Sequence, residues 1–380
     1  MSDEPLTAEQ PLGHLTPDEL LGGDFDTVIL ATVDIQGRLV GKRLSPRAFV
    51  NKVLTGIHVC TCTLAWDMDQ SLEGIAVEYA GLHTGWHDFV IQPDVSTLRV
   101  AAWSDRTAIC LGDAVDHDGE LVPIAPRTIL RRQLERLAAA GLTATTATEL
   151  EFFLYRGSYE SARERDYRDL VPTTTRHADY AIQETEDLEY FFGPLRRALE
   201  QSGLPADMCQ GEWGLGQWEM NLDHGAPLAI ADAHALFKLG VKTMGSRAGL
   251  SASFMARPET DTGIGSSCHV HVSLRDDDGR ALFHDAVTDR GADALVRADG
   301  QQLPANGQRR LRRPRGDVGL RQPHRDLPRG RGIGHRHAAG VPRARRRRQP
   351  LPRARRAAGL GRRRIGALGR PRAADHRQRL

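Results

Sequence analysis

Aromatic residues, Lys and Glu are all missing from the last eighty positions of this 380-residue chain. Its 10 Phe, 6 Tyr and 5 Trp all occur before residue 301, and 54 of the residues after residue 300 are Arg, Ala, Gly or Pro. A segment of this composition cannot bury enough apolar surface to offset the entropy that it would lose on ordering. We therefore expect residues 299–380 to form a disordered, Arg-rich, low-complexity tail.

Acidic residues are scarce in the same part of the chain. Residues 301–380 contain 25 Arg against three Asp, a formal charge of +22, whereas residues 1–300 contain 26 Lys and Arg against 46 Asp and Glu, a charge of −20. The net charge of +2 therefore conceals two segments of opposite character.

Long apolar runs are also missing. No run approaches the ~18 residues that a transmembrane helix needs, and the acidic start of the chain lacks the basic-then-apolar pattern of a secretory signal. We therefore expect no membrane association and a cytoplasmic location. The five cysteines fit neither a disulfide framework nor a CxxC zinc pair, so reduced thiols are expected.

The residues before the tail predict an α+β fold. Residues 1–24 are polar and predict a leader with at most a short helix. Residues 25–119 are rich in short β-branched segments, which predict a small, strand-rich domain. Within it, residues 27–34 and 38–42 flank a turn at Gln36-Gly37 and predict a hairpin.

Residues 120–298 form the second predicted domain, in which helices are combined with strands. Apolar residues recur at helical spacing in three segments, and β-branched or aromatic residues dominate the segments between them. Residues 156–180 are polar and charged, which predicts an excursion over the surface. The predicted helices are 127–140, 188–202 and 227–247, and the predicted strands are 142–155, 210–223 (a strand pair or one bent strand), 251–255 and 268–275.

Two of these strands carry ionisable side chains at alternate positions. Because strand side chains alternate between faces, Glu149 and Glu151 share one face of their strand, and His269, His271 and Ser273 share one face of theirs. Neighbouring carboxylates repel each other unless a cation neutralises both. A solvated face is the alternative for the glutamates, and a packed core position is the alternative for a single histidine. Two histidines after a Gly-Ser loop favour a ligand or phosphate site.

Two further carboxylates, Glu212 and Glu219, lie among Trp, Leu and Met with glycines between them. This pattern favours a bent strand that brings both acids to one place, with solvent-exposed acids as the alternative. Four Glu and one His on the strands of one sheet suit Mg²⁺ or Mn²⁺ better than structural zinc. The residues therefore predict a metal-dependent phosphoryl-transfer site on an antiparallel sheet.

The order of these motifs resembles the glutamine synthetase family, in particular its branch that joins glutamate to polyamines and other amines. The similar segments are Thr148-Glu-Leu-Glu-Phe-Phe-Leu154, Glu212-Trp-Gly-Leu-Gly-Gln-Trp-Glu219 and Gly265-Ser-Ser-Cys-His-Val-His-Val-Ser273. Upstream, residues 33–43 and 92–98 look like the family's N-terminal β-grasp domain. The resemblance covers residues 25–295. It implies a β-grasp domain over 25–119, followed by a partial catalytic domain over 120–298 that is built on an antiparallel sheet with flanking helices.

The resemblance also implies an activity. A family member is an ATP-dependent ligase that forms a γ-glutamyl phosphate from glutamate and converts it with ammonia or an amine into a γ-glutamyl amide. Members assemble into homo-oligomeric rings, in which the β-grasp domain of one subunit completes the site of its neighbour. The implied site residues surround Mg²⁺ (or Mn²⁺), ATP and glutamate: Glu151, Glu212 and Glu219 for one ion, Glu149 and His269 for the second, His271 and Ser273 for ATP, and the Gly265 backbone for glutamate.

Three departures from the family pattern bear on this activity. Arg257-Pro258 stands where the family usually has Lys-Pro, and Ile264-Gly265-Ser266-Ser267 stands where it has Asn-Gly-small-Gly, which favours a different amine or acid. The family's Arg-x-Glu-x-Arg strand, whose Glu would finish the second metal site, is not found after residue 300. We hypothesise a reading-frame shift near residues 290–305, because GC-rich codons read out of frame yield Arg, Ala, Gly and Pro.

A second function stays open for a chain that lacks those residues. It is a catalytically deficient glutamine synthetase-like protein whose basic tail binds nucleic acid or another anionic partner. The 25 Arg would neutralise phosphates, but the tail has neither aromatic residues for base stacking nor Lys, which disfavours a selected nucleic-acid module.

Overall fold

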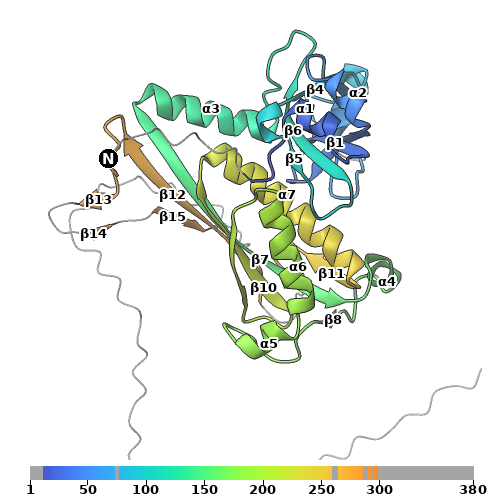
Figure 1. Ribbon diagram of the computed structural model, residues 1–380, viewed down its shortest axis with the longest axis vertical. Coiled ribbons are helices and arrows are strands. Elements are labelled where there is room, and N and C mark those ends of the chain that lie inside the picture. The colour runs from blue at the N-terminus through green and yellow to red at the C-terminus, as the bar shows by residue number, and fades with distance from the viewer. Residues whose placement is uncertain (1–11, 73–76, 259–263, 286–289, 292–293, 298–380) are drawn as a thin grey trace, which may run out of the picture. The chain divides into compact units, whose positions relative to one another are not determined.

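The computed structural model describes residues 12–72, 77–258, 264–285, 290–291 and 294–297 (Figure 1). The predicted tail, 299–380, and the first eleven residues of the predicted leader lie outside these ranges. No helix in the described part of the chain is long and apolar enough to cross a bilayer.

Six strands form the N-terminal sheet, in the order β2-β1-β6-β4-β3 with β5 paired to β6. β1 and β6 run parallel, and the other pairs are antiparallel. The predicted hairpin is confirmed, because β1 pairs with β2 around a turn in which Gly37 adopts φ +74°. The strands are β1 (Thr27–Val33), β2 (Leu39–Leu44), β3 (Ile57–Cys60), β4 (Asp88–Pro93), β5 (Arg99–Val100) and β6 (Thr107–Val115).

Short helices cover this sheet. The short helix predicted in the leader is α1 (Pro17–Gly22), which begins with a capping box between Thr16 and Glu19. Its Leu20 is 1% exposed and packs in the core beneath the N-terminal sheet, so the described leader residues pack together with that sheet. The other helical segments are α2 (Pro46–Val50) and three 3₁₀ turns, Thr61–Leu64, Leu82–Thr84 and Val95–Thr97.

The second sheet has seven strands in the order β15-β12-β7-β10-β9, with β8 and β11 also paired to β7. Every pair is antiparallel, as the sequence predicts. The segment 210–223 proves to be a strand pair. The strands are β7 (Leu142–Arg156), β8 (Val171–Pro172), β9 (Ala206–Gly211), β10 (Gln217–Gly225), β11 (Leu250–Ser253), β12 (Cys268–Asp276) and β15 (Ala294–Arg297), and a separate pair is formed by β13 (His284–Asp285) and β14 (Arg290–Gly291).

Helices pack against one face of this sheet and leave the other face for polar side chains. α6 and α7 lie across β7 and β10 (Figure 1), where Phe152 and Trp218, both fully buried, belong to the shared core. Because side chains alternate, the acids between these core residues point to the opposite face. The helices are α3 (Pro126–Ala139), α4 (Tyr159–Glu164), α5 (Ile182–Glu186), α6 (Glu189–Gln201) and α7 (Pro227–Arg247).

The predicted surface excursion at 156–180 is wrong in part. The segment contains α4 and β8, and Thr173, Thr174 and Ala178 are buried. The two threonines can be buried because their hydroxyls are satisfied. Thr173 Oγ1 accepts a hydrogen bond from Trp218 Nε1 at 3.2 Å, and Thr174 Oγ1 accepts one from the Gly216 amide at 2.7 Å.

A buried arginine joins α3 and α7 to the N-terminal sheet. Arg127, in the first turn of α3, is 4% exposed and forms ion pairs with Asp94 at 2.8 Å and Asp113 at 2.9 Å, both in the N-terminal part of the chain. It also pairs with Asp232 of α7. Three carboxylates from separate elements therefore share one guanidinium, with Arg131 adding contacts to two of them.

Candidate functional site

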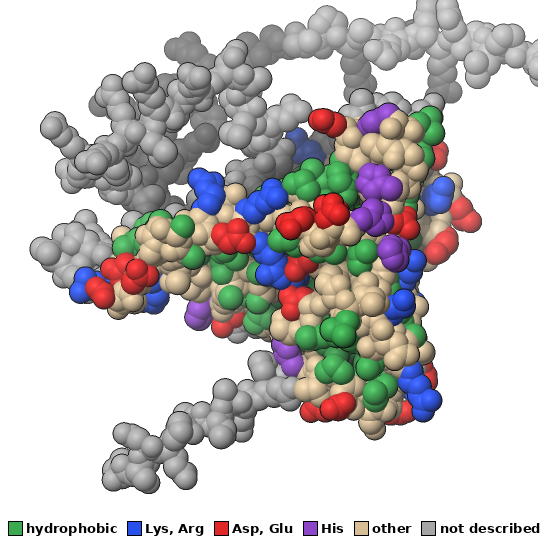
Figure 2. Space-filling view, turned by 90° about the horizontal axis from the view of Figure 1, so that it is seen from above, with side chains coloured by type: hydrophobic (Ala, Val, Ile, Leu, Met, Phe, Trp, Pro, Cys, Tyr) green, Lys and Arg blue, Asp and Glu red, His purple; other side chains and the backbone are tan. Residues whose placement is uncertain are grey.

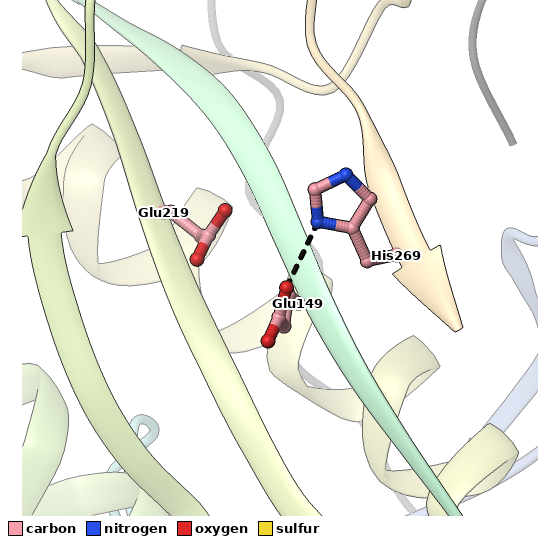
Figure 3. Close-up of side chains that lie close together, drawn as sticks. All are labelled: Glu149, Glu219 and His269. Carbon is pink, nitrogen blue, oxygen red and sulfur yellow. Dashed lines mark hydrogen bonds and ion pairs between the residues drawn. The ribbon is translucent and has the colours of Figure 1, made fainter. Parts of the chain in front are cut away.

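Three side chains of the central sheet form a compact group that could hold a metal ion. Glu149, Glu219 and His269 each offer one ligand atom, and these atoms all lie within 4.8 Å of one another. Figure 3 shows the three side chains converging from neighbouring strands, with His269 Nδ1 at 2.8 Å from Glu149 Oε2. The strand register explains this convergence, because Glu149 of β7 is paired with His269 of β12. Glu219 of β10 is paired with Glu151, which lies on the same face of β7 as Glu149 and two residues from it.

Glu151 lies next to this group but its oxygens already have partners. It is paired with Glu219 across the β7–β10 ladder. Its Oε1 accepts a hydrogen bond from Ser267 Oγ, and its Oε2 accepts one from Gln217 Nε2. The carboxylate is therefore held in place by neutral donors rather than by a basic residue.

The carboxylates of the site repel one another. Burial, followed by repulsion from Glu151 and Glu219, raises the pKa of Glu212 to about 7. Burial and repulsion from Glu149 and Glu151 also raise the pKa of Glu219, which is 5% exposed and accepts a 2.7 Å hydrogen bond from Gln210 Nε2. A divalent cation among these side chains would relieve this repulsion, so the charge of the site fits a bound metal ion.

Glu212 stands outside the compact group of three. It lies in the turn between β9 and β10, where its amide donates to the Gln217 carbonyl at 3.0 Å. Its electrostatic coupling to Glu151 and Glu219 nevertheless places it within the same acidic region.

His271 continues the polar face of β12. Its Nε2 lies 3.0 Å from Glu149 Oε1, but the geometry is not that of a hydrogen bond, and this nitrogen is shielded from solvent. A buried nitrogen without a hydrogen bond is costly and suits a site that a ligand completes. Ser273, two residues farther on, is exposed and is paired in register with Thr145.

Gly265 lies just before β12, where the chain passes very close to another backbone segment. A Cβ atom at this position would lie 2.4 Å from the Ala256 carbonyl oxygen, so only glycine fits there. Its own carbonyl accepts a 3.0 Å hydrogen bond from Gln217 Nε2. The Gln217 amide therefore connects Gly265 with Glu151.

The structure thus brings Glu149, Glu219 and His269 together, places Glu151 and His271 in contact with them or their partners, and leaves Ser273 exposed. The metal, nucleotide and glutamate roles of the eight predicted residues stay predictions. Sequence reasoning missed Gln210, Gln217 and Ser267. Alternation could have found two of them, because Gln217 shares a strand face with Glu219, and Ser267 precedes His269 by two. Gln210 acts across a strand pair whose register the sequence does not give.

Comparison with known proteins places this site in a family context. Residues 123–298 match the family described as the glutamine synthetase catalytic domain. The chain is 40% identical over 260 residues to the γ-glutamylethanolamide synthetase GlnA4 of Streptomyces coelicolor, covering 68% of this chain and 55% of that protein. It is 31% identical over 262 residues to the glutamate–isopropylamine ligase of a Pseudomonas species, covering 68% of this chain and 56% of that protein.

The chain spans about half the length of these curated relatives. Among solved structures, apo GmaS without ligand has a TM-score of 0.60 and 23% sequence identity, covering 71% of this chain and 59% of that one. At this level of identity the likeness concerns the fold.

Proposed function

Residues 123–298 are a glutamine synthetase catalytic domain, and we propose from this that the chain is an ATP-dependent ligase that forms a γ-glutamyl amide from glutamate and ammonia or an amine. The observation that carries the proposal is the convergence of Glu149, Glu219 and His269 from three antiparallel strands. The names of the relatives, which act on ethanolamine-type and isopropylamine substrates, support an organic amine as the acceptor.

In this proposal divalent cations bind to the acidic face, by which we mean Glu149, Glu151, Glu212 and Glu219 together with His269. Glu151, Glu212 and Glu219 would hold one Mg²⁺ or Mn²⁺, and Glu149 and His269 would help to hold a second. These ions supply positive charge that neutralises the triphosphate of ATP. The raised pKa values of Glu212 and Glu219 support this assignment, because a carboxylate region that resists ionisation is one that a cation stabilises.

The remaining predicted residues would position the substrates. His271, whose Nε2 lacks a hydrogen bond, and Ser273 are the proposed contacts to ATP. The backbone at Gly265 is the proposed contact to glutamate, with its carbonyl fixed by Gln217. The γ-carboxylate of glutamate attacks the terminal phosphorus of ATP and expels ADP, and the amine then displaces phosphate from the γ-glutamyl phosphate and loses a proton.

We extend the proposal to the rest of the chain. The six-stranded N-terminal sheet, with its parallel β1–β6 pair, is proposed to be the family's β-grasp domain, and the subunits are proposed to assemble into homo-oligomers. The catalytic domain is proposed to be incomplete at its C-terminal end, and the second metal site then lacks one carboxylate.

ADP release measures this function directly. The full chain is incubated with ATP, glutamate and Mg²⁺, together with ammonia, ethanolamine, isopropylamine, putrescine or spermidine in turn, and the γ-glutamyl product is identified by mass spectrometry. We expect ADP release that requires both glutamate and one amine. We expect Glu219→Gln to lower it by about a hundredfold or more, since a metal ligand is lost, and the exposed control Glu200→Gln to leave it unchanged.

If no amine gave ADP release, the proposed ligase activity of this chain would be contradicted. If the silent chain also retained RNA in a salt-sensitive manner, the catalytically deficient, tail-binding alternative would be favoured. That alternative rests on residues outside the described ranges.

A further inference from the structure

We propose that the N-terminal sheet carries a second metal site, formed by His58, His87 and His117, that binds Zn²⁺ and is separate from the acidic face. The ring centroids of His58 and His117 are 6.4 Å apart, and those of His87 and His117 are 6.3 Å apart. His117 is therefore a neighbour of both other rings. All three side chains are exposed, and Figure 2 shows histidine side chains gathered next to one another on the face that it presents.

The topology of the sheet explains why residues from three distant segments meet. His58 lies on β3 and is paired with Val90 of β4, which is paired in turn with Val115 of β6. His117 follows β6 by two residues, and His87 precedes β4 by one. The opposite face of β4 presents Phe89 and Ile91 to the core, so the face that carries Val90 and its partner His58 is turned to solvent.

The spacing of His117 from each of the other two rings is close to that within a metal site. Three imidazoles bound to one ion at 2.0–2.1 Å in tetrahedral geometry have ring centroids about 5 Å apart. The observed separations of 6.3 and 6.4 Å exceed this by about 1 Å. Exposed side chains can close such a gap by rotation about their side-chain torsions, since no close packing opposes it.

Two further observations favour a metal. His87 Nδ1 lies 3.4 Å from the Thr84 carbonyl oxygen; this contact directs the Nδ1 proton to a backbone acceptor and leaves Nε2 as the free ligand atom, which is the arrangement of metal-bound histidines. Asp88 is paired with Cys60 and shares the solvent face of β4 with Val90, the partner of His58, so this face also carries a carboxylate. His58 and Asp88 both line a cavity of about 410 Å³.

The ligand type separates the two sites chemically. Imidazole suits Zn²⁺ and other first-row transition ions, whereas carboxylate oxygen suits Mg²⁺ and Mn²⁺. The histidine site therefore takes Zn²⁺ even in a large excess of Mg²⁺, and the excess Mg²⁺ competes for the carboxylates of the acidic face. The inference does not depend on the proposed ligase activity.

Zinc titration of the full chain tests the site. Zn²⁺ is added in excess Mg²⁺, its affinity is measured by competition with a chromophoric chelator, and its stoichiometry is measured by native mass spectrometry. We expect His117→Asn and His58→Gln each to remove one tightly bound Zn²⁺, with affinity at that site reduced by about tenfold or more. X-ray absorption of the unmodified protein is expected to show imidazole coordination that weakens in His117→Asn.

The matched control is His224→Asn, because His224 is an exposed histidine at the end of β10 whose ion pair, within the described ranges, is with its neighbour Asp223. This variant should bind Zn²⁺ as the unmodified chain does. Circular dichroism verifies that each variant is folded, and histidines elsewhere in the chain contribute equally to all of them. The proposal is overturned if His117→Asn and His58→Gln, both folded, bind Zn²⁺ with unchanged stoichiometry and affinity.

Discussion

Glu212 has the most strongly shifted pKa among the described carboxylates of the site. This shift makes the free energy of unfolding depend on pH. Its pKa rises from 4.5 to about 7 in the folded chain. Between these values the folded chain holds a proton that the unfolded chain has released, so the free energy of unfolding falls as pH rises through this window. The raised pKa of Glu219 acts in the same direction.

We therefore expect urea unfolding in a chelator to show lower stability at about pH 8 than at about pH 5. Glu212→Gln should flatten this dependence, because it removes the titrating group, and saturating Mn²⁺ should do the same in the unmodified protein. Identical pH slopes in the variant and the unmodified chain would show that Glu212 does not experience the repulsion described above.

Gln217 is a second residue whose loss has a defined effect. It is 2% exposed, its Oε1 accepts from the Gly214 amide at 2.8 Å, and its Nε2 donates to both Glu151 and Gly265. We expect Gln217→Ala to lower stability by about 1–3 kcal/mol, because buried partners lose their hydrogen bonds. It should also weaken Mn²⁺ binding by roughly tenfold to a hundredfold.

Urea unfolding and Mn²⁺ titration by electron paramagnetic resonance measure these two effects of Gln217→Ala. Gln133→Ala, at an exposed position of α3, serves as the control and should change neither value. Undiminished Mn²⁺ affinity in Gln217→Ala would mean that Glu151 does not need this amide to be placed for metal binding.

At the scale of the elements, β1 and β6 show what the sequence could and could not predict. Both strands carry β-branched and apolar runs in the sequence, at 27–33 and at 107–111. Their residues are buried on both faces, Leu30 and Cys110 in one core and Ala31 and Leu111 in the other. A continuous apolar run is what a strand buried on both faces requires, but the run does not say which element covers the second face.

The site residues, too, could be predicted only in part. Alternation within a strand predicted that Glu149 and Glu151 share a face, and that His269 and His271 do. The family resemblance suggested a common site. The exact neighbours could not be predicted, because the register between strands depends on turns and packing distant in sequence.

The ion pairs of Arg127 connect α3, α7 and the N-terminal sheet, and their loss is expected to be severe. Arg127→Met leaves Asp94, Asp113 and Asp232 without their shared buried partner. We expect a loss of about 3–5 kcal/mol in the free energy of unfolding. Arg132→Met, at an exposed position on the same helix, should cost almost nothing. An Arg127→Met chain of unchanged stability would contradict the importance of this cluster.

On the scale of the whole described chain, one face of the N-terminal sheet shares a hydrophobic core with the central sheet, while its other face has a core of its own. Trp103, from the N-terminal part, is 2% exposed and belongs to the same cluster as Phe191 and Leu199 of α6. We therefore expect the N-terminal sheet and the central sheet to unfold in one cooperative transition. Hydrogen exchange should give similar global opening free energies for amides of β1 and β7.

Trp103→Ala provides the corresponding mutational test. We expect it to lower stability by about 3–5 kcal/mol and to reduce amide protection in both sheets together. Loss of protection confined to the N-terminal sheet, with β7 unaffected, would show that the two sheets open independently.

The single side-chain nitrogen of Gln217 that reaches both Glu151 and the Gly265 carbonyl has one more consequence. The Gly265 backbone is the proposed contact to glutamate, and Glu151 is a proposed cation ligand. A displacement of one of these residues would therefore be transmitted to the other through Gln217. Thermodynamic reciprocity then requires that whatever factor glutamate contributes to manganese affinity, manganese contributes to glutamate affinity. The Gln217 amide would thus couple the binding of glutamate to the binding of the cation.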